Sequence, residues 1–476
     1  MTIAFAAVML LSLVLALWSR RGHARPDARE FFTASGQFGP ILFFFLSVGE
    51  TYSIATMLGF PGGVYTGGES FVLWFFGYIL MAAPAIYFVG PWIWRAGALY
   101  ASATIPDFFR SHFGSRALEI LIAGSAIMLL IPIGTTQFLG LKLVFSGLAP
   151  GVPSILLTGL AGLLTFAYVA LAGLRASAFV AVLKDIAMMT SILLVGGMAI
   201  IMWGDASPST LPSVTPPPST GSGSLTFAVT TIVLQAAGFV MIPQNWAFIF
   251  SARSPRAIQR AQIVAPLYMV MFPLLMIVAY YARSSGIVPP APDYVFLATA
   301  SALLPRWLVG VVMAAVVLSG LVVLSSVCLA IGPLFTRNLV PGLNSQAQQR
   351  WSQLVIALFI GFSLIAAEMS VPLIATLNNI FYFGIVQPLP GFVAAMLLPR
   401  VPARAVLAGI VGGDAFILWA RLCQVDLAGV NPGLIGLAIN AVILALVTAA
   451  WPRHGKLSVM QQFAARRAAR AANHPG

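Results

Sequence analysis

The chain has 476 residues, of which 60% are hydrophobic and only 8% are charged. Soluble proteins carry about a quarter charged residues, so this composition excludes a soluble globular fold. The formal net charge of +13 does not indicate nucleic-acid binding either, because the basic residues are spread over short loops instead of gathering on one face. Apolar runs of about 17 or more residues recur along the sequence, which is typical of an all-α polytopic membrane protein.

Thirteen runs are apolar and long enough to be transmembrane helices. They lie at 3–18, 37–65, 70–92, 117–147, 152–172, 177–203, 225–251, 262–282, 305–333, 351–367, 371–397, 404–421 and 431–452. Arg20 and Arg21 follow the first run, whereas a secretory signal peptide carries its positive charge before the apolar core. The first run is therefore predicted to be a true span.

The placement of the basic residues predicts the orientation of the chain. With the N-terminus outside, the cytoplasmic segments hold all but four of the 25 Lys and Arg residues. The exceptions are Lys142, Arg283, Arg306 and Arg421. The positive-inside rule thus predicts a multi-pass protein of the cell inner (cytoplasmic) membrane, with the N-terminus outside and the C-terminus cytoplasmic.

A proline- and serine-rich periplasmic loop is predicted at 204–224, near the middle of the sequence. After the first run at 3–18, five predicted spans precede this loop, and five follow it before the last two. Because five is an odd number, the second group has the inverted topology, an arrangement found in transporters. The predicted organisation is an accessory span and loop at 1–36, five-helix repeats at 37–203 and 225–397, two accessory spans at 398–452 and a basic cytoplasmic tail at 453–476.

The first core span, 37–65, carries an acid near its middle, Glu50. A charged group in a bilayer costs at least a few kcal/mol to insert, so its presence indicates a function. Gly49 permits local unwinding, and the hydroxyl residues that follow can satisfy freed backbone groups. The triplet Pro61-Gly62-Gly63 is predicted to end the helix. A protonated Glu50 that only hydrogen-bonds the broken backbone is the alternative.

The first span of the second half has a similar interruption, Gln235-Ala-Ala-Gly238 followed by Pro243-Gln-Asn-Trp246. Interrupted helices at matching places in two repeats indicate a binding site at the bilayer midplane. The simpler alternative is that both interruptions are packing kinks, because Gly and Pro are common in membrane helices.

Several short motifs carry a family resemblance. They are Met57-Leu-Gly-Phe-Pro-Gly-Gly-Val-Tyr65, Gly77-Tyr78 with Pro84, Thr104-Ile-Pro-Asp-Phe108 with Phe113-Gly-Ser-Arg116, Ile131-Pro132 with Gln137 and Gly140, Gly173-Leu-Arg-Ala176, and Pro388-Leu-Pro-Gly391 with Pro399-Arg400. In this order they resemble the sodium:solute symporters, which share the leucine-transporter-type fold. The resemblance implies a secondary transporter of 13 transmembrane helices. Its 5+5 inverted-repeat core would have one N-terminal and two C-terminal accessory helices.

Gly49-Glu50-Thr51-Tyr52, Lys184-Asp185 and Arg337-Asn338 resemble one subgroup, the monocarboxylate permeases that carry lactate and pyruvate. The predicted function is uptake of a small organic acid by alternating access. No arginine lies at the presumed midplane, so N–H groups of the broken helices would meet the substrate anion. The predicted substrate-binding residues are Gly49, Glu50, Thr51, Tyr52, Ser53, Tyr78, Gln137, Gln235, Phe239, Gln244, Trp246 and Gln387.

The sequence departs from the family at the sodium site. Sodium-coupled members place two hydroxyl residues in the eighth core helix and an acid in the fifth. An ungapped count back from Arg337-Asn338 gives valines in the eighth, and the acidic position of the fifth is an alanine. Hard cations need oxygen ligands, which these side chains lack. We expect a degenerate sodium site at Gly49, Tyr52, Ala181, Val322 and Val323, although a shift of three residues would bring Ser325 and Ser326 to the hydroxyl positions and restore it.

Lys184 follows Ala181 by about one helical turn, so its ammonium group could stand where sodium otherwise binds. A lysine in a low-dielectric site can gain and lose a proton near neutral pH. We therefore expect sodium-independent, proton-coupled transport, with Glu50, Lys184 and Asp185 as the ion-coupling residues. The alternative for Lys184 is a lysine near a span end that extends toward water and pairs locally with Asp185.

Two other functions stay open: a sodium-coupled symporter for sugar, proline or another solute, and a membrane receptor that binds a solute and signals through a partner. An enzyme is disfavoured, because the sequence offers no nucleophile–base pair or metal-ligand cluster, and no cofactor or metal is predicted. The expected partners are the substrate, H⁺ or Na⁺, membrane lipids and a small membrane subunit, with no nucleic acid. Cys328 and Cys423 indicate no disulfide framework.

Overall fold

The computed structural model describes residues 1–18, 40–149, 151–203, 225–369, 374–451 and 457–473. Every element within these residues is helical, as the predicted fold class requires. In chain order the elements are α1 (Thr2–Trp18), α3 (Pro40–Thr51), η2 (Ala55–Gly59), α4 (Phe60–Tyr100), α5 (Ile105–Phe113), α6 (Arg116–Leu148), α7 (Ser154–Trp203), α8 (Leu225–Phe239), α9 (Pro243–Ser251), α10 (Pro255–Val264), η3 (Ala265–Val270), α11 (Met271–Ser284), η4 (Pro292–Tyr294), α12 (Val295–Leu303), α13 (Arg306–Pro333), η5 (Leu334–Leu339), α14 (Ser345–Met369), α15 (Ile374–Ile385), α16 (Pro388–Leu397), α17 (Ala403–Leu422), α18 (Pro432–Ala450) and α19 (Val459–Asn473). The predicted loop at 204–224 lies outside the described residues.

Many of these helices are membrane-spanning by length and composition. Within the described ranges, 8 are long and apolar enough to cross a bilayer, or up to 10 if each bent pair is one span. Two shorter apolar helices, Thr2–Ala16 and Ser154–Ala167, add to them. The spans predicted at 152–172 and 177–203 are continuous in the structure as α7, one helix of 50 residues that begins at Ser154. The chain is thus a multi-pass helical membrane protein, and the count of thirteen spans stays a prediction.

The first core helix is broken close to Gly49, as predicted. α3 continues through Gly49 to Thr51, and the backbone unwinds at Tyr52 and Ser53. A short π-helix, η2, then leads into α4. Pro61-Gly62-Gly63 does not end the helix, because Pro61 lies in the first turn of α4, where its missing N–H is tolerated. The turn comes at Gly68, whose φ of +61° suits glycine.

Two further helices bend at a break. α8 and α9 meet at 45° around Val240–Ile242, between the glycine and proline that predicted this interruption. α15 and α16 meet at 41°, just before Pro388. Each break leaves backbone groups without helical partners, so side chains must satisfy them or a ligand must bind them.

The centre of the molecule is α13. Almost all of its residues from Val309 to Pro333 are buried, and it packs against α1, α6, α7 and α14. A helix that is buried on all sides in a membrane protein is held by close van der Waals packing with its neighbours. This central position lets α13 contact both the first broken helix and the connections at one end of the bundle.

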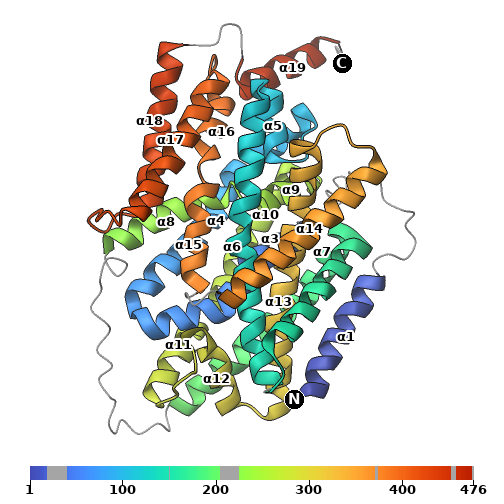
Figure 1. The fold of residues 1–476 in the computed structure, drawn as a ribbon, viewed down its shortest axis with the longest axis vertical. Helices are drawn as coiled ribbons and strands as arrows, with labels where there is room; N and C mark the ends of the chain where they lie inside the picture. Colours follow the sequence, from blue (N-terminus) through green and yellow to red (C-terminus); the bar gives the residue numbers. More distant parts are fainter. Residues whose placement is uncertain (19–39, 150, 204–224, 370–373, 452–456, 474–476) are drawn as a thin grey trace.

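Figure 1 shows α5, α16 and α19 at one end of the molecule and α11, α12 and the start of α1 at the other. We call these the α5 end and the α12 end. Two of the helices at these ends lie in segments that the sequence analysis treated as connections or tails. α5 lies in the connection before α6, and α19 lies in the basic tail and packs against α16.

Candidate functional site

The break in the first core helix holds a buried ammonium group. Lys184, on α7, donates hydrogen bonds from Nζ to the carbonyl oxygens of Gly49 (3.1 Å) and Tyr52 (2.7 Å). Its Nζ also lies 2.6 Å from Oδ1 of Asp185, and both side chains are 0% exposed. The carbonyls at the end of α3 lack intrahelical donors, so a cation from another helix can satisfy them. The pair is therefore an internal ion pair that closes the end of α3.

Small apolar side chains surround this ammonium. A Cβ atom built on Gly49 would lie 3.5 Å from Cβ of Ala181, 3.8 Å from Nζ of Lys184 and 3.9 Å from Cγ1 of Val322. Gly49, Ala181 and Val322 of the predicted degenerate sodium site thus lie together. Tyr52, a fourth member, joins them through the bond from Lys184 to its carbonyl. The oxygens that they supply to Lys184 are backbone carbonyls, while Ala181 and Val322 offer no ligand atom.

The two serines of the shifted alignment use their hydroxyls within their own helix. Ser325 donates to the carbonyl of Leu321 (2.7 Å), and Ser326 donates to the carbonyl of Val323 (2.8 Å). Hydroxyls that bond back to the preceding turn are common in membrane helices. Val323 itself faces the cavity described below instead of Lys184.

Asp185 and Tyr52 complete the surroundings of the ammonium. Oδ2 of Asp185 is buried and has no hydrogen-bond partner among the described residues. The Tyr52 hydroxyl donates to the sulfur of Met269 on η3 (3.2 Å), so Tyr52 presents only its carbonyl to Lys184. The backbone of Glu50 belongs to α3, next to Gly49, and its side chain lies outside the described part of the structure.

A cavity lies between the break in the first core helix and the break between α8 and α9. Its lining combines hydroxyl and amide groups with aromatic rings, and six of the predicted substrate-binding residues contribute to it. These are Thr51, Ser53, Tyr78, Gln137, Phe239 and Gln244. Among the residues that the sequence analysis did not select are Thr136, Asn378, Phe381 and Tyr382. Oε1 of Gln137 is buried without a hydrogen-bond partner in the described chain, which leaves an acceptor available to a ligand.

Asn378 could have been found from the sequence. Asn378 and Asn379 interrupt the apolar span predicted at 371–397, and a polar pair inside a membrane helix indicates function or helix contacts. Phe381 and Tyr382 gave no such signal, because aromatic residues are ordinary in membrane helices. Their place in the lining follows only from how α15 packs.

A model of the sodium:solute symporter family matches residues 31–413. The chain belongs to this family. It is 25% identical to the monocarboxylate transport permease protein of Rhizobium johnstonii, a match that covers 94% of this chain and 95% of that protein. It is also 25% identical to the uncharacterized symporter YhjB of Bacillus subtilis, over 92% of this chain and 93% of that protein.

Solved structures of transporters give the fold of this symporter-family chain. A Na⁺-coupled sialic acid symporter in a substrate-bound outward-open state aligns with a TM-score of 0.74 at 16% identity, covering 96% of this chain and 98% of that one. Mhp1, a nucleobase-cation-symport-1 family transporter, aligns with a TM-score of 0.53 at 14% identity, covering 90% and 97%. The fold is therefore of the leucine-transporter type, and the protein is a membrane transporter of the symporter family.

Three of the predicted substrate-binding residues of this symporter lie in or near the helix breaks, where they form hydrogen bonds within the protein. Gln235 donates to Asn379, and the Trp246 indole N–H donates to the carbonyl of Val240 (2.8 Å). Gln387 donates to the carbonyl of Phe383 and accepts from Asn440 on α18. All three side chains are fully buried. Their hydrogen bonds stabilise the broken helices, and none of the three lines the central cavity.

The sequence analysis missed a carboxylate in the connection between α11 and α12. Asp293, in η4, accepts the backbone N–H of Ile374 at the start of α15 (3.1 Å). A Cβ on Gly62 would come within 2.6 Å of its Oδ1 and 2.8 Å of its Cα, so η4 packs directly on the first turn of α4. Burial raises the pKa of Asp293 to about 6, and the Ile374 N–H opposes this shift in part.

Proposed function

We propose that this transporter takes up a small monocarboxylate, such as pyruvate or lactate, and that protons drive the uptake in place of sodium. The observation that carries the second part is the Lys184 ammonium on the carbonyls of Gly49 and Tyr52. A fixed cation already satisfies these oxygens, and the neighbouring Ala181 and Val322 supply none. A sodium ion would have to displace the ammonium and would find too few ligands.

In this proposal Lys184 and Asp185 carry the proton. Both side chains are 0% exposed and 2.6 Å apart, so a change in either charge alters the balance that holds α3 to α7. Opening of the site to one side would let water exchange a proton with the pair. Glu50, which follows Gly49 directly, is the third coupling residue in this scheme. Replacing it by Gln should weaken coupling more than folding, and unchanged pH dependence in E50Q would remove it from the scheme.

The central cavity is the proposed substrate site. It lies next to two helix breaks, whose N–H groups can meet an anion, and its lining offers the Gln137 amide and the Tyr78 and Thr51 hydroxyls. Apolar rings such as that of Phe239 suit the carbon end of a small organic acid. The relative in Rhizobium johnstonii, which is named a monocarboxylate transport permease, supports this substrate class.

The proposal includes the membrane arrangement predicted from the sequence. Thirteen spans form a 5+5 inverted repeat with one accessory helix before it and two after it, in the inner membrane. The α5 end, where Arg110, Arg116 and Arg337 form ion pairs, is cytoplasmic in this arrangement, in line with the positive-inside rule. Alternating access then exposes the central cavity first to the outside and afterwards to the cytoplasm.

Uptake into proteoliposomes decides between the candidate functions. Labelled pyruvate, proline and glucose are offered separately, with a sodium gradient or a pH gradient imposed alone. The proposal expects pyruvate uptake that follows the pH gradient and ignores sodium. Uptake of proline or glucose that needs sodium would favour the sodium-coupled alternative, and binding without uptake of any solute would favour a receptor.

A further inference from the structure

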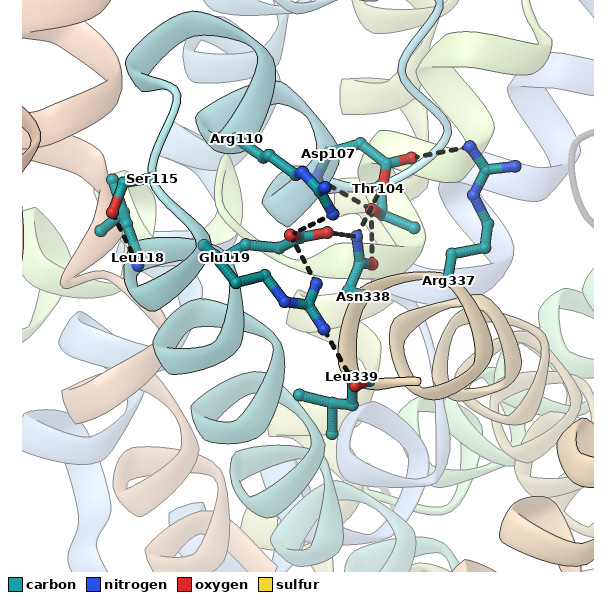
Figure 2. Close-up of polar contacts among 10 residues, drawn as sticks. Thr104, Asp107, Arg110, Ser115, Leu118, Glu119, Arg337, Asn338 and Leu339 are labelled. Carbon is teal, nitrogen blue, oxygen red and sulfur yellow. Dashed lines mark hydrogen bonds and ion pairs between the residues drawn. The ribbon is translucent and has the colours of Figure 1, made fainter. Parts of the chain in front are cut away.

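A buried asparagine joins three elements at the α5 end (Figure 2). Nδ2 of Asn338, on η5, donates to Oδ1 of Asp107 on α5 (2.6 Å) and to Oε1 of Glu119 on α6 (3.0 Å). Its Oδ1 accepts from the hydroxyl of Thr104, just before α5 (2.8 Å). Both amide hydrogens and the amide oxygen are thus bonded, in a side chain that is fully buried. A satisfied buried amide fixes the relative positions of the groups around it.

Arginines complete this group of contacts, which we call the Asn338 cluster: Thr104, Asp107, Arg110, Arg116, Glu119, Arg337 and Asn338. Oε2 of the buried Glu119 accepts from Arg110 (2.9 Å) and Arg116 (2.6 Å), and Arg116 also donates to the carbonyl of Leu339 (2.9 Å). Arg337 pairs with Asp107 at 3.2 Å. The arginines are partly exposed and water screens them, whereas Glu119 is 1% exposed. Glu119 therefore depends strongly on its partners.

The local sequence explains why α5 presents these groups. Thr104 caps α5 by accepting the N–H of Asp107 (3.2 Å), and Asp107 accepts the N–H of Ala103 (3.0 Å), a reciprocal capping arrangement. Gly114, with φ of +68°, ends α5 in the left-handed region. Ser115 then caps α6. The motif at 104–116 thus fixes both ends of α5 and directs Asp107 toward η5.

Another face of α5 is aromatic. The ring of Phe108 lies 5.8 Å from that of Trp246 on α9 and 5.5 Å from that of Phe392 on α16, and the last two are 5.3 Å apart. These distances are typical of edge-to-face and tilted ring contacts. Trp246 also donates to the carbonyl of Val240 in the break between α8 and α9. One side of α5 thus contacts the α5-end halves of two broken helices.

We propose that α5 is the inner gate of the transporter: the Asn338 cluster holds it on α6 and α13, and its aromatic face closes on Trp246 and Phe392. The two faces differ in what their separation costs. Parting the Asn338 cluster leaves buried polar groups unpaired, whereas parting the aromatic rings leaves no polar group without a partner, so these contacts can part and reform. The connection to α4 contains Ala101, whose φ of +52° ends that helix before α5 begins. α5 can therefore stay with α6 and η5 while α9 and α16 move away.

The test measures access to the central cavity from each side of the membrane. Thr136, which lines the cavity, is replaced by Cys as the reporter. The exposed Cys423 is replaced by Ser. Any labelling of the buried Cys328 is measured in a sample without the reporter and subtracted. A membrane-impermeant maleimide is applied to sealed vesicles of both orientations. Labelling of S111C, at an exposed position on α5, identifies the vesicles whose α5 end faces the reagent.

Two variants are compared with matched controls. N338A should raise the reporter rate by about tenfold or more over N344A, because Asn338 makes three buried hydrogen bonds and Asn344 only caps the exposed start of α14. F392A should likewise raise the labelling rate of the reporter over that of its control F416A, which changes a phenylalanine on α17. The increase should occur only from the α5 side. T104V removes one of the three bonds together with the cap of α5. It should also raise the reporter rate from the α5 side, and it serves if N338A does not fold.

Equal rates in the variants and their controls would overturn the proposal. An increase from both sides of the membrane would also overturn it, because it would indicate general loosening of the helices. The assay follows a thiol and not a solute, so it can fail or succeed independently of the proposed substrate and coupling ion.

Discussion

The ammonium group of Lys184 lies 2.7 Å from the carbonyl oxygen of Tyr52, the residue at which the first core helix unwinds. A broken membrane helix leaves carbonyls that must be bonded inside the protein, because the hydrocarbon core holds no water. In this chain a lysine from α7 supplies the bond. The cation at this point therefore belongs to the protein itself.

Replacing Lys184 by Met should abolish most of the uptake driven by a pH gradient. Without the ammonium the carbonyls of Gly49 and Tyr52 lose their donor, and no group at that point can carry the proton. We expect the initial rate of pyruvate uptake to fall at least about tenfold, the effect of a barrier increase of about 1.4 kcal/mol. The matched control is K142M, because Lys142 forms a partly exposed pair with Glu368. Uptake in K184M that still follows the pH gradient at the wild-type rate would show that Lys184 has no coupling role.

Substitutions of Lys184 and Asp185 should have strongly non-additive effects on stability. K184M leaves the Asp185 carboxylate buried without its cation, which costs about 3–5 kcal/mol. K184M/D185N removes both charges and should recover most of this loss. Unfolding of the C423S protein in detergent can be followed by the thiol reactivity of Cys328, which is buried in the folded state. A double variant no more stable than K184M would mean that the pair does not act as a unit.

The sequence predicted the helical class, most spans and two of the broken helices, because Gly238, Pro243 and long apolar runs are local signals. It placed the first break next to Gly49, and the backbone unwinds shortly after it, at Tyr52 and Ser53, since Gly49 permits unwinding without requiring it. Contacts between distant residues had no local signal. Lys184 lies 132 residues along the chain from Tyr52, and Asn338 lies 234 residues from Thr104. Which carbonyl or carboxylate each would bond follows only from the packing of α7 and α13.

Loss of polar groups from the central cavity should weaken substrate binding more than turnover. Q137L removes an acceptor that has no partner among the described residues, so the folded protein loses little while a bound substrate loses a hydrogen bond. We expect KM for pyruvate to rise by about tenfold, the effect of losing about 1.4 kcal/mol. Q346L, at an exposed position on α14, is the matched control. An unchanged KM in Q137L would place the substrate elsewhere.

The aspartate in the connection between α11 and α12 should make stability depend on pH. The pKa of Asp293 is raised to about 6 from an ordinary value of 3.8, chiefly by burial. The folded protein therefore holds this proton more tightly than the unfolded chain does. Stability from this group is greatest below about pH 4, falls as the pH rises and levels off above about pH 6. The full change is about 3 kcal/mol, at about 1.4 kcal/mol for each pKa unit.

D293N isolates this effect, because the amide oxygen of the asparagine can still accept the Ile374 N–H while the side chain stays uncharged. Melting temperatures of wild type and D293N are compared at about pH 5 and about pH 7.5. We expect wild type to lose more stability than D293N as the pH rises, and D293N to be the more stable of the two at the higher pH. All other titrating groups cancel in this double difference. Parallel pH profiles for the two proteins would mean that Asp293 titrates at its ordinary value and that its burial against Gly62 has no electrostatic cost.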